Sequence, residues 1–119
     1  MNRCLVLLVA VPWLAAADTL PQPDPAAKTR TVASIALESQ RLTGGGVRLP
    51  DNYGMSYRGK RFTGSYRICI NPSGRVYDVD TVASLGDADE PIVQALRAWT
   101  YKPQTANVCA IKTFTFVMP

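Results

Sequence analysis

The sequence predicts an α+β fold: a small three-stranded antiparallel sheet in the order 2-1-3, with a helix packed on one face and an additional N-terminal helix. Apolar residues alternate along 61–70 and a second strand is expected over about 75–83, with Asn-Pro-Ser-Gly between them, which is typical of a β-hairpin. An apolar stripe at helical spacing follows before Pro103, and a last alternating run spans 111–118.

Residues 1–17 have the pattern of a secretory signal peptide. Arg3 provides a short basic region, the uncharged run from Cys4 to Ala17 is mostly apolar, and small residues precede Asp18. This run is shorter than the roughly 20 apolar residues that span a membrane. We therefore expect cleavage, and a periplasmic or secreted protein. The net charge of +4 falls to +3 when Arg3 is removed, which favours no particular partner.

The rest of the chain is long enough for one domain. Residues 18–46 are predicted to form a proline-containing tail, a helix over 31–42 and a glycine hinge, and residues 47–119 the domain itself. Its first part, Val47 to Lys60, is expected to be a loop with a short extended piece.

The helix that follows the hairpin is predicted from the residues at its start and from a stripe of apolar side chains. Asp87 or Asp89 is expected to cap it, and Pro91 suits its first turn because the missing N–H costs nothing there. The apolar stripe consists of Ile92, Ala95, Leu96 and Trp99. We expect the helix to continue until Pro103 stops it.

The predicted topology shows whether the two cysteines that remain after cleavage can form a disulfide. The helix returns the chain so that the last strand lies antiparallel to the first. Cys69, near the end of the first strand, and Cys109, just before the last, then lie side by side on the face away from the helix. The sequence therefore predicts a Cys69–Cys109 disulfide, whose closed loop of about 40 residues stabilises by roughly 3–4 kcal/mol.

The sequence argues against an enzyme. There is no histidine, so a nucleophile activated by histidine is excluded. The acids at 87, 89 and 90 are explained by the helix start, and two cysteines without histidine lack the ligands for a metal site. We therefore expect no catalytic residues, no metal, no cofactor and no small-molecule substrate. Export and the small net charge also argue against nucleic acid.

Three segments, taken together, resemble the TonB C-terminal domain family. They are the hairpin over Gly64–Val76, the helix end Leu96–Pro103 with its Arg-Ala-Trp-Thr-Tyr-Lys-Pro motif, and Phe114–Phe116. The resemblance covers about residues 62–119 and implies a periplasmic fold related to the TolA C-terminal domain. In that family the third strand offers its open edge to a short segment of an outer-membrane receptor, which adds as an extra strand.

The resemblance places the binding site on the edge of the last strand. The expected partner-binding residues are Ile111, Lys112, Thr113, Phe114, Thr115, Phe116 and Val117, with Lys112 as the only charge that protects the edge. A covered edge or a homodimer contact through the same strand is the alternative. The family-motif residues Trp99, Tyr101 and Pro103 are expected to be structural.

The function expected from these observations is a non-catalytic periplasmic protein-binding module. Family transducers keep an uncleaved membrane helix and a long proline-rich spacer, whereas the N-terminus of this chain is expected to be cleaved and its tail has only three prolines. We therefore transfer the fold and the binding mode and not the motor function. The alternatives are a membrane-anchored energy transducer for outer-membrane transport with an uncleaved N-terminus, and a small exported enzyme of unknown type.

Overall fold

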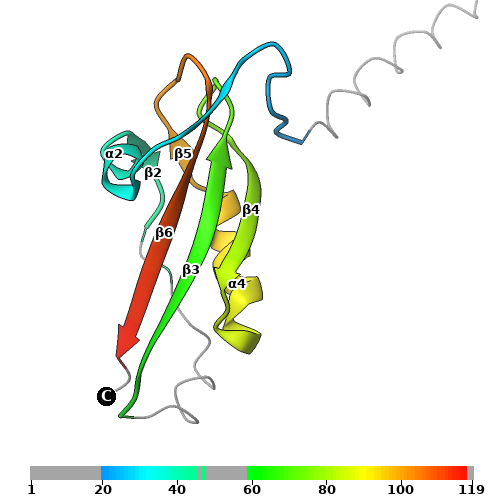
Figure 1. The fold of residues 1–119 in the computed structure, drawn as a ribbon. Coiled ribbons are helices and arrows are strands. Elements are labelled where there is room, and N and C mark those ends of the chain that lie inside the picture. The colour runs from blue at the N-terminus through cyan, green and yellow to red at the C-terminus, as the bar shows by residue number, and fades with distance from the viewer. Residues whose placement is uncertain (1–19, 46, 48–58, 118–119) are drawn as a thin grey trace, which may run out of the picture.

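A computed structural model of the 119-residue chain describes residues 20–45, 47 and 59–117. Its centre is a four-stranded mixed sheet in the order β1-β6-β3-β4, and β2 and β5 form a separate two-stranded sheet (Figure 1). The elements are β1 (Thr29–Thr31), α2 (Ser34–Glu38), β2 (Arg41–Thr43), β3 (Arg61–Ile70), β4 (Val76–Ala83), the 3-10 turn η2 (Gly86–Ala88), α4 (Asp89–Arg97), β5 (Thr100–Tyr101) and β6 (Asn107–Val117).

The predicted fold class is therefore wrong: the sheet has four strands instead of three, a second sheet is present, and α4 is the one substantial helix of the described residues. Strands β4, β3 and β6 do lie next to one another in the predicted order, and both pairings are antiparallel. The difference comes from β1, which adds to the sheet in parallel with the start of β6.

The hairpin of β3 and β4 closes through a turn that Asn71 organises. The amide of Gly74 donates to the Asn71 carbonyl at 2.9 Å, and the Asn71 side chain accepts from the amide of Arg75 at 3.0 Å. Gly74 has φ +86°, a conformation that glycine adopts at little cost. In β4 the register shifts between the pairs Cys69–Asp78 and Ile70–Val76. This bulge marks the end of the hairpin nearest the turn.

Helix α4 packs on one face of the sheet and lies next to β4 in Figure 1. Ile92 and Leu96 are fully buried and belong to the same core as Tyr66, Ile68 and Ile70 of β3. The helix ends at Arg97, so its predicted continuation to Pro103 is wrong. The helix ends there because the backbone amides of Tyr101 and Lys102 donate hydrogen bonds to carbonyl groups outside the helix.

Two backbone hydrogen bonds hold the segment after α4. The amide of Tyr101 donates to the Gly74 carbonyl at 2.9 Å, and that of Lys102 to the Gln40 carbonyl at 2.8 Å. Strand β5, which contains Tyr101, pairs with β2 in an antiparallel direction. Tertiary partners therefore override the local preference for helix in this stretch.

Asp89 joins the start of α4 to the sheet. Its carboxylate accepts hydrogen bonds from the Tyr66 hydroxyl at 2.6 Å, from the Leu85 amide at 2.8 Å, and from the Ser84 hydroxyl. Burial by itself raises the pKa of Asp89, but the hydrogen bonds from Ser84, Tyr66 and Leu85 outweigh it and lower the pKa below its usual value. The carboxylate therefore holds the loop between β4 and α4 against β3.

The N-terminal helix expected over 31–42 is also wrong, because α2 is only five residues long and strands flank it on both sides. The tail before β1 is anchored by Asn107, which is 2% exposed. Its side chain accepts from the amide of Asp24 at 2.9 Å and donates to the carbonyls of Asp24 at 2.9 Å and Ala27 at 3.3 Å. This anchoring brings β1 beside β6.

Because β1 supplies a partner, β6 begins at Asn107, four residues before the start of the predicted strand at Ile111. No helix within the described residues is long and apolar enough to cross a membrane. The predicted signal peptide at 1–17 and most of the loop at 47–60 lie outside the described residues.

Candidate functional site: the edge of strand β6

Strand β6 is paired on both sides only along its first residues. On its outer side the amide of Asn107 donates to the Lys28 carbonyl, and the Cys109 carbonyl accepts from the Val32 amide, each at 2.9 Å. The register with β1 ends at Cys109, and beyond it none of the described strands pairs with this side of β6. We call residues 111–117 the β6 edge.

The two outer hydrogen bonds establish which backbone groups of the β6 edge point outward. In an antiparallel ladder the backbone of successive residues points alternately to the two neighbours. Since Asn107 and Cys109 bond on the outer side, the odd-numbered residues after them also present their N–H and C=O groups outward. These residues are Ile111, Thr113, Thr115 and Val117. The even-numbered residues point to β3.

One face of the β6 edge carries short, β-branched side chains. The Thr113 hydroxyl lies 3.0 Å from that of Ser65, and the Thr115 hydroxyl 3.2 Å from that of Thr63. Ile111 and Val117, at the two ends of the row, are 46% and 62% exposed. This face lies opposite the one from which Phe114 and Phe116 pack against the core.

The other face carries a row of aromatic rings. The ring centroids of Phe114 and Phe116 are 6.2 Å apart, and each ring has a further partner on β3. Tyr66 lies 6.1 Å from Phe114, and Phe62 lies 6.1 Å from Phe116. Both phenylalanines are only partly buried, so an added strand would gain apolar contacts on this face.

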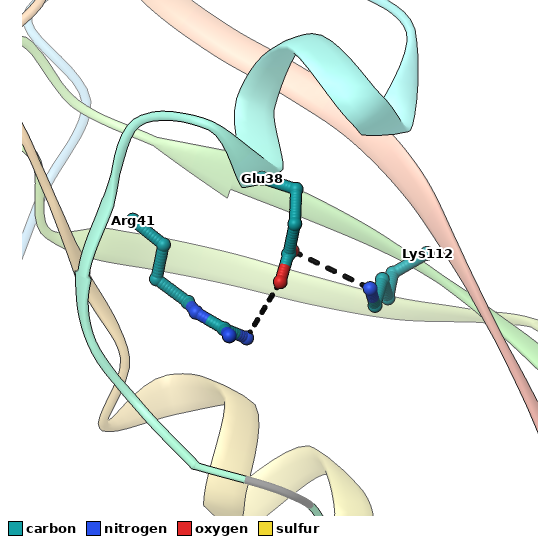
Figure 2. A network of polar contacts seen from close by, with 3 residues as sticks. All are labelled: Glu38, Arg41 and Lys112. Carbon is teal, nitrogen blue, oxygen red and sulfur yellow. Dashed lines mark ion pairs between the residues drawn. The ribbon is translucent and has the colours of Figure 1, made fainter.

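Lys112 is the only charged residue of the β6 edge, and it is engaged by α2 (Figure 2). Its Nζ lies 3.4 Å from Oε2 of Glu38, while Oε1 of Glu38 lies 2.8 Å from Arg41. The sequence analysis missed Glu38 and Arg41, although their i, i+3 spacing is a recognisable local signal. The charge that would protect the edge is therefore partly neutralised.

The family-motif residues lie beside the β6 edge but not in it. Trp99 is 4% exposed; the Arg41 guanidinium lies 4.4 Å from its ring centre, and Phe114 makes an edge contact at 6.4 Å. Tyr101 is 2% exposed, and burial, with the charge of Glu38, raises its pKa to about 12. Pro103 is exposed in the loop after β5.

Trp99 also has a close backbone neighbour. A Cβ atom at Gly44, whose φ is +128°, would stand 2.5 Å from the Trp99 ring. Gly44 belongs to the predicted glycine hinge, and in the structure it lies directly against this ring. Trp99 thus connects β2, α4 and the aromatic row through contacts on several sides.

The Cys69–Cys109 disulfide lies where the β1 pairing ends. The two residues are opposite one another in the β3–β6 register, with Cα atoms 4.1 Å apart, and each is 1% exposed. The bond joins β6 to β3 two residues before the β6 edge begins. Within the described residues, no three potential metal-ligand side chains gather in one place.

No protein-family profile, curated protein or solved structure matches this chain.

Proposed function

We propose that the chain is a non-catalytic periplasmic protein-binding module, and that the β6 edge pairs with a short extended segment of a partner protein. The observation that carries the proposal is the row of outward backbone groups from Ile111 to Val117, which no described strand satisfies. Such a row is a ready template for an additional strand. The resemblance to the TonB C-terminal domain favours the same use of this strand.

The geometry favours a partner segment that begins where β1 ends. Strand β1 already occupies the outer side of β6 as far as Cys109, where its register ends, and the chain then forms α2, which contacts β6 without adding a strand to it. A partner strand would continue the same layer along the remaining seven residues. Backbone hydrogen bonds would supply affinity, and the two faces of the edge would supply selectivity.

The two faces favour different side chains on the partner. Next to Phe114 and Phe116 an apolar or aromatic residue gains the most contact. Next to Thr113 and Thr115 a β-branched or hydroxyl residue fits the short cross-strand row. The resemblance implies an outer-membrane receptor as the source of such a segment.

A proline at position 113 tests the proposal, because the N–H of Thr113 points outward and does not bond to β3. We expect T113P to remain folded and to lose partner binding by about tenfold or more, since it removes one backbone donor and places a ring where the partner backbone would lie. The measurement is the amount of each protein retained from periplasmic and outer-membrane extracts by immobilised mature chain.

The control is T113V, which keeps the outward N–H and removes only the hydroxyl contact with Ser65. It should retain the same partner as the wild-type chain. Circular dichroism and the intact Cys69–Cys109 disulfide establish that each variant is folded. A folded T113P variant that retains the same partner in the same amount would show that the β6 edge is not the binding surface.

A further inference from the structure

A hollow of about 280 Å³ lies beside β4, the strand at the edge of the sheet opposite β1. Three separate parts of the chain form it: the tail at Leu20–Gln22, Arg75 with the first residues of β4, Val76 and Tyr77, and Arg97 at the end of α4. The hollow shares no lining residue with the β6 edge, so what it binds is independent of the proposed function.

Hydrogen bonds hold the walls of this hollow in place. The Asn71 side chain donates to the Gln22 carbonyl at 2.9 Å, which ties the tail to the hairpin turn. The same residue bonds the backbone of Arg75 on both sides, at 3.0 Å through its side chain and at 2.9 Å through its amide. The Arg75 backbone is therefore fixed relative to the tail.

The charges around the hollow are uncompensated. Arg41, Arg67 and Lys112 each lie within 4.0 Å of a carboxylate, whereas neither Arg75 nor Arg97 forms an ion pair with any residue that the structure describes. No acidic side chain lines the hollow. The charge of Arg97 does act on Asp78: burial and the neighbouring Asp80 raise the pKa of that carboxyl, and the charges of Arg67 and Arg97 lower it by less.

Helix position explains only one of the two arginines. A base in the last turn of α4 complements the helix dipole, which accounts for Arg97. Arg75 follows a hairpin turn and has no such role. Two guanidinium groups and the Tyr77 phenol around one hollow provide the planar donors that oxyanions prefer. Leu20 and Val76 add apolar wall next to these donors.

We propose that this hollow binds an oxyanion group, with Arg75 and Arg97 as its charged donors and Tyr77 as a third donor. The group is a phosphate, either free or on a lipid headgroup, and the apolar wall accommodates the carbon atoms next to it. The combination of two unpaired arginines from different elements and a hollow without acids carries this assignment.

Titration of the mature chain with inorganic phosphate, followed by backbone NMR, tests the free form. We expect saturable shifts of the Arg75, Tyr77 and Arg97 amides. The double variant R75Q/R97Q should bind phosphate at least about tenfold more weakly than the wild-type chain, because hydrogen bonds from charged donors are among the stronger ones. The control R30Q/R61Q removes the same charge outside the hollow and should leave the affinity unchanged.

Vesicles distinguish the two sources of the phosphate. Sedimentation with phosphatidylglycerol vesicles, but not with phosphatidylcholine vesicles, that is lost in R75Q/R97Q and kept in R30Q/R61Q would assign a lipid headgroup. Saturable binding of inorganic phosphate without vesicle binding would assign a free anion. The proposal is overturned if neither probe binds, or if R30Q/R61Q weakens binding as much as R75Q/R97Q does.

Discussion

Replacing Cys69 and Cys109 together by alanine is expected to lower the free energy of unfolding of the mature chain by about 3–4 kcal/mol. The disulfide joins residues 40 apart in sequence, and opening it restores conformational freedom to the unfolded chain. It also links two adjacent strands that share the core with α4. Urea denaturation of the oxidised wild-type chain and of C69A/C109A measures the difference.

Reduction of the disulfide with dithiothreitol provides a control for this prediction. Dithiothreitol should destabilise the wild-type chain by a similar amount and leave C69A/C109A unchanged, because the variant has no bond to reduce. Since small domains are stable by only about 5–15 kcal/mol, the loss is a large fraction of the total. A difference below about 1 kcal/mol between oxidised wild type and variant would contradict the predicted contribution.

Replacing Gly74 by alanine is expected to lower the free energy of unfolding by roughly 2–5 kcal/mol. Gly74 has φ +86°, and a Cβ atom there would stand 1.9 Å from the Tyr101 carbonyl oxygen and 3.2 Å from that of Lys102. Both obstacles are backbone atoms, so the turn or β5 must shift to make room. The change also disturbs the hydrogen bond from the Tyr101 amide to Gly74.

Gly86 provides the matched control for this substitution. It has φ +68°, but a Cβ atom there would have no atom within 4 Å. G86A should therefore show only the cost of the left-handed backbone, about 1–2 kcal/mol. Thermal and urea unfolding of both variants separates the conformational cost from the steric one. If G74A loses no more stability than G86A, the close approach of β5 to the hairpin turn is wrong.

The central hairpin and the disulfide were predictable because their signals are local. Residues 61–70 alternate without interruption, and the turn sequence specifies a hairpin by its proline and its glycine. Once the strand order follows, the positions of Cys69 and Cys109 leave one arrangement for the bond. Each step in this reasoning used neighbouring residues or a rule of handedness.

The N-terminal segment was not predictable in the same way. Strand β1 is three residues long and exposed, so it has no apolar alternation that would reveal it. Its place depends on Asn107, a buried polar residue 83 positions away from Asp24 in sequence. Strand β5 likewise depends on β2, which lies far back in the chain. Contacts of this range override local propensity and leave no periodic pattern.

The candidate site was predictable only as a strand. The alternation of residues 111–117 identifies a strand, and the predicted order placed it at the edge of the sheet, whereas β1 occupies that position and covers β6 as far as Cys109. That Glu38 would engage Lys112 could not be seen, because it requires α2 to lie beside β6. The hollow at Arg75 and Arg97 was also missed, since it is formed by three segments that are distant in sequence.

Residue-resolved amide hydrogen exchange, with and without the partner retained by the wild-type chain, tests the central claim about the β6 edge most directly. In the free chain we expect the outward amides of Ile111, Thr113 and Thr115 to exchange faster than those of Lys112 and Phe114, which point to β3. With the partner bound, all five should be protected. Slow exchange of the outward amides in the free chain, or their continued fast exchange in the complex, would contradict the proposed pairing.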